Sequence, residues 1–291
     1  MASKNKTIFN VFESTPLMDF LIENMPHKNR NNIKSLLRNK QVLVDDQPVS
    51  QFNHLLVPGQ KVKISSSRSR MEQKFRDFTI VFEDDDLIVI DKAAGLLSIA
   101  TKNEKRNTAY SLLSGYVKRT DAGHKIFIVH RLDRDTSGLM VFAKNEEVKN
   151  TLQKNWNEAV LEKTYVAVVE GTVVEPEGTI ESYLYEDKVF RVHSSQNPRK
   201  GLRAVTHFSV LKANKNCTLL NVNIETGRKN QIRVHMQEMG HCIVGDKKYG
   251  ATTNPIRRLG LHAQKLVFSH PVTGETLNFE TKIPVAFSRL F

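Results

Sequence analysis

The nine residues His130–Gly138 combine charged side chains with a turn. Asp133 and Asp135 are the carboxylates among them, basic residues stand beside both, and Thr-Ser-Gly closes the stretch. The apolar runs 126–129 and 139–143 on either side are typical of strands buried on both faces. A carboxylate between buried strands can act as a nucleophile, but it is costly to hold there unless a cation pairs with it. The pattern alone fits a structural ion-pair turn equally well.

Two further polar residues stand in apolar surroundings. Tyr165 lies within a strand predicted over 162–171, where a core tyrosine is the ordinary interpretation. Arg233 follows Ile232 in a helix expected from Asn230 to Gly240, so its side chain should be partly buried. A buried guanidinium needs a partner, and a carboxylate is the natural one.

The elements that must position these residues begin after residue 77. Two strands around an acidic turn are predicted over 80–92. Thr108 is predicted to cap an amphipathic helix over Ala109–Arg119, and Asn145 caps a second helix that carries Trp156 as a core residue. Further strands are predicted over 208–212, 217–224, 262–268 and 277–279. Strands outnumber helices, which indicates an α+β domain with a mainly antiparallel sheet.

The first quarter of the chain is predicted to be a small basic module. Short helices near Pro16 and Asn32 precede short strands and form a compact unit over 14–65. Residues 1–74 contain twelve Lys and Arg against six Asp and Glu, so they hold half of the chain's net charge of +12. This concentration favours a nucleic-acid contact over a uniformly solvated surface. The candidate contacts are Lys28, Arg30, Lys34, Arg38 and Lys40.

Composition narrows the class of protein further. A net charge of +12 over 291 residues indicates a polyanionic partner, most simply nucleic acid. The two cysteines, Cys217 and Cys242, lack the spacing of a metal site or a disulfide framework, which suits a reducing compartment. No apolar run approaches the ~18 residues of a membrane span, and no signal-type core follows the N-terminus. We expect a cytoplasmic protein that does not contact a membrane.

Several motifs, in order along the chain, resemble those of RluA-type pseudouridine synthases. They are His130–Asp133 with Thr136–Gly138, Glu162–Tyr165, and Gly227–Arg228 with Gln231–His235. Residues 240–250 and 261–275 are similar to the continuation and the closing hairpin of that family. The resemblance covers roughly residues 78–285. Residues 14–65 resemble the S-four-like RNA-binding domain, which is named after a ribosomal small-subunit protein.

The resemblance implies a domain organisation. Residues 78–291 would form the catalytic domain, an α+β fold with a mainly antiparallel mixed sheet of the pseudouridine synthase type. The small α/β RNA-binding domain over 14–65 would precede it. We expect a tail over residues 1–13, and the serine-rich basic segment 66–77 is expected to be a flexible linker.

The resemblance also implies residue roles. Asp133 would be the catalytic aspartate, attacking either the ribose anomeric carbon or the uracil ring; composition does not distinguish it from Asp135. Tyr165 would pack against the target base and help remove the proton from ring carbon five. Arg233 would pair with Asp133 and keep it ionised. The substrate-binding residues would be Arg131, Ile232 and His130.

The function implied is the isomerisation of specific uridines to pseudouridine in structured RNA by a monomeric enzyme. The reaction takes no electrons or groups from outside, so no cofactor or metal is required. Large-subunit ribosomal RNA is the default target, and transfer RNA is an alternative. A non-catalytic RNA-binding ribosome-assembly factor is a second class. A glycoside hydrolase using Asp133 and Asp135 is disfavoured, because carboxylates two residues apart on a turn flank a bond poorly.

Overall fold

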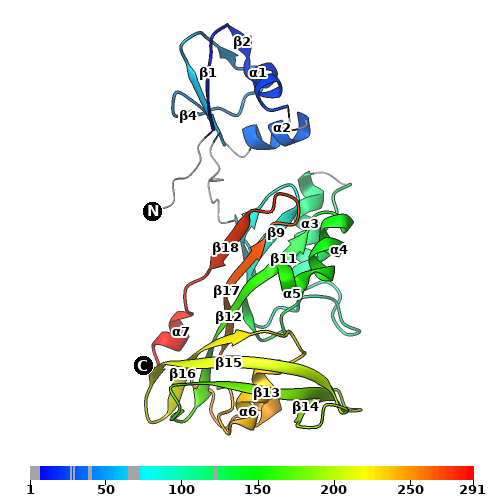
Figure 1. The fold of residues 1–291 in the computed structure, drawn as a ribbon, viewed down its shortest axis with the longest axis vertical. Helices are drawn as coiled ribbons and strands as arrows, with labels where there is room; N and C mark the ends of the chain where they lie inside the picture. The colour runs from blue at the N-terminus through cyan, green and yellow to red at the C-terminus, as the bar shows by residue number, and fades with distance from the viewer. Residues whose placement is uncertain (1–6, 27, 29, 39–40, 65–72, 121–122) are drawn as a thin grey trace. The chain divides into compact units, whose positions relative to one another are not determined.

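The computed structural model describes residues 7–26, 28, 30–38, 41–64, 73–120 and 123–291. The chain divides into two compact units, residues 1–72 and 73–291, and Figure 1 shows the elements of each. None of the helices in the described ranges is long and apolar enough to cross a membrane.

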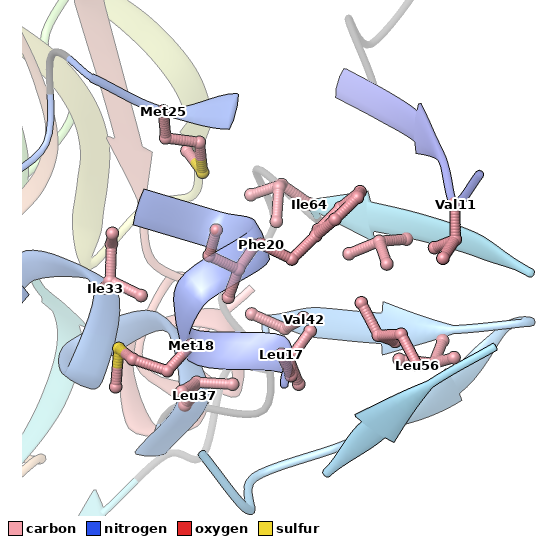
Figure 2. Close-up of a cluster of buried hydrophobic side chains, with 13 residues drawn as sticks. Val11, Leu17, Met18, Phe20, Met25, Ile33, Leu37, Val42, Leu56 and Ile64 are labelled. Carbon is pink, nitrogen blue, oxygen red and sulfur yellow. The ribbon is translucent and has the colours of Figure 1, made fainter. Parts of the chain in front are cut away.

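In the described part of the small unit, two helices pack against a small sheet. The elements are β1 (Thr7–Asn10), β2 (Thr15–Pro16), α1 (Leu17–Asn24), α2 (Arg30–Arg38), β3 (Val42–Val44), β4 (Gln47–Pro48), β5 (Leu55–Leu56) and β6 (Lys61–Ile64). The antiparallel sheet has the order β1-β6-β3-β4, and β2 pairs with β5. Figure 2 shows side chains from both helices and the sheet meeting in one core, where Leu17, Ile33 and Val42 are fully buried.

Strand β1 corrects part of the predicted tail. Phe9 of β1 pairs with Val62 of β6. The Phe9 ring meets the Phe20 ring of α1 edge-on, with 6.3 Å between ring centroids, and packs against the core. The prediction of a tail over 1–13 is therefore wrong for residues 7–10. A strand of four residues offers too few positions for a period-two pattern to be recognised.

Helix α2 presents part of the predicted basic set to solvent. Arg30 and Lys34 are exposed one turn apart, while Ile33 and Leu37 of the same helix are buried in the core. Lys28, just before the helix, is half-buried. Arg38 is the last residue of α2, and Lys40 lies outside the described residues. Exposed cations at this spacing share one helix face, as a phosphate contact requires.

The large unit is built around one mixed sheet. Its strands are β7 (Gln73–Lys74), β8 (Phe78–Glu83), β9 (Leu87–Lys92), β10 (Phe127–Ile128), β11 (Ser137–Ala143), β12 (Val160–Glu170), β13 (Glu177–Glu186), β14 (Val192–Ser195), β15 (Leu202–Ala213), β16 (Cys217–Ile224), β17 (Leu261–Ser269) and β18 (Thr276–Glu280). The order is β14-β13-β15-β16-β12-β17-β11-β9-β8-β7, with β10 beside β11 and β18 beside β17. The predicted α+β fold with a mainly antiparallel sheet is confirmed.

Helices cover both faces of this sheet (Figure 1). They are α3 (Ala109–Thr120), α4 (Glu146–Lys154), α5 (Trp156–Ala159), α6 (Gln231–Glu238), the 3-10 turn η1 (Lys247–Tyr249) and α7 (Val285–Ser288). Even-numbered core residues of β9 and β11 pack with α3, and odd-numbered ones pack with α4. Farther along the sheet, α6 packs on one face of β12 and β16, and α7 packs on the opposite face. This division follows from the two-residue period of a strand.

Strands β11 and β17 form the one parallel pair among the described strands. Ser137 aligns with His262, and Gly138 aligns with Ala263. Gly138 has φ 117°, and a Cβ built there would lie 2.2 Å from the Ala263 carbonyl oxygen. Only glycine permits this approach. This close pairing fixes the start of β11, where the loop that follows β10 ends and the chain re-enters the middle of the sheet.

Two sequence predictions for this unit are wrong in extent. The run 126–129 forms only the two-residue strand β10, which is half-buried. Ile126 and Val129 are nevertheless buried, each in a core cluster on a different face of the sheet. Residues Gln73–Lys74, at the end of the expected linker 66–77, pair with β8 as strand β7 and so belong to the sheet.

Candidate active site

The loop between β10 and β11 is held from inside the domain by Lys92. This lysine ends β9, and its side chain is completely buried. Its Nζ donates at 2.8–3.1 Å to three backbone carbonyl oxygens, those of Ala93, Leu96 and Arg134. Burial lowers the pKa of Lys92 to about 8, although the nearby carboxylates of Asp135 and Asp133 act to raise it. The ammonium group therefore ties the strand to the loop.

Asp133 lies between two anchored residues of this loop. The Leu132 carbonyl oxygen accepts a hydrogen bond from Ser98 Oγ at 2.6 Å, and the Leu132 N–H donates to Ser98 Oγ at 3.2 Å. On the other side, Lys92 holds the carbonyl of Arg134. The Asp133 side chain is 26% exposed. Its backbone is thus fixed while its carboxylate stays open to a ligand.

Arg233 joins Asp133 to a second carboxylate. Arg233 Nη1 donates to Asp133 Oδ2 at 3.3 Å, across 100 positions of sequence. The expected contact between these residues is therefore present. The shorter contacts of Arg233 are with Asp246, however: Nε donates to Oδ2 at 2.6 Å, and Nη2 donates to Oδ1 at 2.8 Å. The Asp246 side chain is 1% exposed, so this bidentate pair is the anchor and Asp133 is the more open partner.

Aromatic and amide groups complete the frame around the Arg233 guanidinium. Its Cζ lies 5.0 Å from the centroid of the Tyr249 ring. Asn230 Oδ1 accepts from Nη1 at 3.1 Å, and Asn230 Nδ2 donates to the Tyr249 hydroxyl at 2.9 Å. Burial works against the charge, but the bonds to Asp246 and then to Asp133 raise the pKa of Arg233. Arg233 is therefore a fixed, permanent cation.

Tyr165 and Ile232 form an apolar wall. Both belong to the core cluster under α6, in which Ile232 is buried and Tyr165 is half-buried. The Tyr165 hydroxyl makes no hydrogen bond with any described residue. Burial, together with the negative charge of Asp133, raises the pKa of Tyr165 well above its ordinary value. The phenol therefore stays protonated near neutral pH.

His130, which was predicted to bind substrate, is instead hydrogen-bonded to the sheet. Its Nε2 accepts the Val141 N–H at 3.0 Å, and its ring lies 4.8 Å from the Trp156 ring, centroid to centroid. Burial, with the nearby charge of Lys163, lowers the pKa of His130 to about 4. The neutral imidazole can therefore accept this backbone hydrogen bond, which positions the loop. The same contact makes the predicted core residue Trp156 a half-buried neighbour of the site.

A basic hollow of about 480 Å³ adjoins Arg233. Its lining includes six basic side chains and two acidic ones: Arg134, Arg233, Lys247, Lys248, Arg257, Arg258, Asp135 and Asp246. Gly245 also lines it, with φ 76°, and a Cβ there would lie 2.3 Å from the Arg258 carbonyl oxygen. Arg131 is exposed and pairs with no described residue. Such an excess of positive charge suits an anion such as phosphate.

Comparison with known proteins identifies the chain. The family model for RNA pseudouridylate synthase matches residues 86–238. The chain is 32% identical over 264 residues to YhcT, an uncharacterized RNA pseudouridine synthase of Bacillus subtilis, covering 89% of this chain and 86% of that protein. The chain belongs to the RNA pseudouridylate synthase family. It is also 33% identical over 276 residues to ribosomal large subunit pseudouridine synthase D of Neisseria meningitidis, covering 89% and 73% of the two chains.

Solved structures of pseudouridylate synthases have the same fold. The chain is similar to human RNA pseudouridylate synthase domain containing 4, with a TM-score of 0.58 and 24% identity over 72% of this chain and 90% of that one. For human RNA pseudouridylate synthase domain containing 1, the TM-score is 0.57 and the identity 23%, over 73% and 86%. The expected family and fold are confirmed, and the chain is an isomerase that forms pseudouridine in RNA.

Sequence reasoning missed several residues of this pseudouridine synthase site. Asp246 and Tyr249 were noticed only as part of a family motif, and nothing local reveals that both contact Arg233. The sequence gives only a weak indication for Lys92. A lysine at the end of an apolar strand can either be buried with hydrogen-bond acceptors or reach solvent at the edge of the sheet, and the sequence does not distinguish the two. Asn230 was expected to begin the helix; it does so with φ 54°, in the left-handed region.

One described group resembles a cation site by composition. Asp84, Asp86 and His270 bring ligand-type atoms within 4.8 Å of one another. Both ring nitrogens of His270 are already used, however. Nδ1 accepts the N–H groups of Val272 and Thr273, and Nε2 faces Asp84 Oδ2 at 3.1 Å. The arrangement therefore stabilises the turn between β17 and β18.

Proposed function

We propose that this pseudouridine synthase modifies ribosomal RNA, with Asp133 as its catalytic carboxylate. The observation that carries the proposal is the contact between Asp133 and Arg233 beside a basic hollow. A carboxylate nucleophile must be ionised, and an adjacent guanidinium favours its charged form. This holds whether the carboxylate attacks the ribose anomeric carbon or the uracil ring.

Arg233 acts by orientation as well as by charge. Its Nε and Nη2 are bound to Asp246, so the direction of Nη1 toward Asp133 is set by a buried partner. A guanidinium anchored in this way does not have to reorganise as charge shifts on Asp133 during the reaction. Asp246 is therefore a positioning residue, and Arg233 is the residue that touches the catalytic carboxylate.

Tyr165 and Ile232 would receive the target uracil. Uridine must leave its stack before its glycosidic bond can be reached, and an aromatic ring beside an apolar side chain gives the extruded base a surface. The raised pKa of Tyr165 favours the neutral phenol. We therefore assign it packing and hydrogen bonding to the base, in place of proton abstraction as a phenolate. The exposed cation of Arg131 would contact the flipped nucleotide, and His130 positions the loop.

Two basic regions would bind the RNA and position it at the site. The hollow beside Arg233 would accept backbone phosphates near the target uridine. In the small unit, which resembles an S-four-like domain, Arg30 and Lys34 would contact RNA from α2, as would Lys28. Relatives named for the ribosomal large subunit support ribosomal RNA as the target. One chain carries every residue named here, so we expect the enzyme to be active as a monomer. We also expect it to be cytoplasmic and to work without a cofactor.

Pseudouridine mapping of total RNA from a strain that lacks the gene tests this proposal. The wild-type gene should restore the lost sites, Asp133→Asn should not, and Asp135→Asn should. The control removes a carboxylate from the same loop, one that pairs with its neighbour Arg134. Lost sites in large-subunit ribosomal RNA support the target, and lost sites in transfer RNA contradict it. An unchanged map would favour a non-catalytic RNA-binding factor.

A further inference from the structure

We propose that Phe190, at the tip of the β13–β14 hairpin, is a base-stacking contact for the RNA strand beside the target uridine. The inference rests on the proposed function, because it takes RNA as the ligand. The hairpin lies beside α6, which carries Arg233 (Figure 1). The proposal extends the RNA-binding surface beyond the catalytic loop and the basic hollow.

Phe190 is displayed to solvent in an unfavourable conformation. Its side chain is 72% exposed, and its φ of 62° lies in the left-handed region. A bulky residue is rarely found there, because its Cβ meets the neighbouring carbonyl oxygen. With most of the side chain exposed, burial among the described residues does not account for this placement. Strain of this kind is characteristic of positions where a ligand is held.

Hydrogen bonds at the hairpin tip fix the backbone that carries the Phe190 ring. The Phe190 N–H donates to the Asp187 carbonyl oxygen at 3.1 Å. Asp187 Oδ1 accepts the N–H groups of Val189 and Arg191, both at 2.9 Å. Asp187 Oδ2 lies 2.7 Å from Nε2 of His193. The tip is thus organised before a ligand arrives, which lowers the entropy cost of binding.

Cations connect Phe190 to the basic hollow. Lys248 lines the hollow, and its Nζ donates to the Phe190 carbonyl oxygen at 3.0 Å. Lys229 is a second cation near the ring, with its Nζ 5.8 Å from the centroid of the Phe190 ring. An aromatic ring among cations is how proteins bind single-stranded nucleic acid, because phosphates pair with the cations while a base stacks on the ring. The surface therefore favours RNA over an apolar protein partner.

Binding of two matched probes to the full-length protein tests the proposal. One probe is a short fluorescein-labelled oligoadenylate, and the other is an abasic ribose-phosphate strand of the same length and charge. Phe190→Ala should weaken oligoadenylate binding by roughly tenfold, the scale of one lost stacking contact, and leave abasic binding unchanged. Phe190→Trp should restore the preference. Lys248→Gln should weaken binding of both probes, because it removes a phosphate contact.

Val189→Ala is the control, since Val189 is an apolar residue of the same tip and is 78% exposed. It should change neither affinity. The stacking role is overturned if Phe190→Ala preserves the preference for oligoadenylate, or if Val189→Ala removes it equally. Failure of the proposed function would appear separately, as a wild-type gene that restores no pseudouridine in the deletion strain. Unfolding temperatures of the variants exclude misfolding as the cause.

Discussion

Arg233 and Asp246 form a bidentate pair inside the large unit, with Nε–Oδ2 and Nη2–Oδ1 distances of 2.6 and 2.8 Å. The Arg233 side chain is 11% exposed and that of Asp246 is 1% exposed. The contact to Asp133, the proposed catalytic residue, uses the remaining Nη1, which also donates to Asn230. The orientation of the guanidinium is therefore decided by a residue that the substrate need not touch.

Asp246→Asn should slow turnover on the order of a hundredfold, because the guanidinium would no longer be held toward Asp133. It should also lower the free energy of unfolding by about 3 kcal/mol, because Arg233 would keep a buried charge without its main partner. Single-turnover rates and urea unfolding measure the two effects. Glu181→Gln is the control: it breaks a bidentate pair with Arg203 on the surface, and solvent screens such pairs. Full turnover by Asp246→Asn would contradict the positioning role.

Lys92→Met should destabilise the protein by at least about 3 kcal/mol, because three carbonyl groups lose their donor. The wild-type protein should also show a pH signature. The folded pKa of about 8 lies below the ordinary 10.5, so between these values the unfolded chain binds more protons. The stability difference between wild type and variant should therefore grow as pH rises from 8 to 10.5. Urea unfolding across that range tests it, and a flat difference would be the contrary result.

His262 should make the protein sensitive to acid. It is 3% exposed and lies between the hydroxyls of Ser137, at 2.7 Å, and Thr281, at 2.8 Å. Burial, with the nearby charge of Arg258, lowers the pKa of His262 from 6.5 to about 4. The folded state thus keeps the neutral ring, and the stability gained is complete above pH 6.5 and is lost as pH falls toward 4.

Between pH 7 and pH 5, His262 should contribute about 2 kcal/mol to the stability that the wild-type protein loses. His130, whose pKa is also lowered to about 4, adds a loss of its own. His262→Gln keeps an acceptor and a donor but does not titrate, so it should lose correspondingly less. Urea unfolding at the two pH values gives both numbers. Equal losses in the two proteins would show that other groups cause the acid sensitivity.

Gly138→Ala should prevent the parallel pairing of β11 with β17. A Cβ at φ 117° would lie 2.2 Å from a backbone oxygen that cannot move aside alone. We expect a loss of more than about 3 kcal/mol or a failure to fold. Gly115→Ala in α3 is the control, because no atom lies within 4 Å of its Cβ position and its backbone is helical. It should stabilise the helix by about 0.5–1 kcal/mol. Thermal unfolding compares the two.

Local features of the sequence were predictable because their causes lie within a few residues. Thr108 caps α3 by accepting the Ser111 N–H at 3.0 Å, and Asn145 caps α4 by accepting the Val148 N–H at 2.8 Å. The closing hairpin of β17 and β18 was likewise visible as two apolar runs around a turn. Such signals depend on spacing alone.

The remaining features depend on contacts between distant segments. Lys92 and Arg134 are 42 positions apart, and Asp133 and Arg233 are 100 positions apart. The second of these contacts was expected from the need of a buried arginine for a carboxylate, together with the family resemblance. That reasoning did not identify Asp246 as the stronger partner of Arg233. Asp246 reaches Arg233 only because the segment after α6 folds back onto the helix, and the local sequence does not reveal this.

The most direct test of Asp133 as the catalytic residue is a rate measured in vitro. Purified wild-type, Asp133→Asn and Asp135→Asn proteins are each incubated with RNA from the strain that lacks the gene, and pseudouridine is quantified over time. We predict product from the wild type and from Asp135→Asn, and none from Asp133→Asn, although all three proteins bind the RNA. Pseudouridine formed by Asp133→Asn would contradict the assignment.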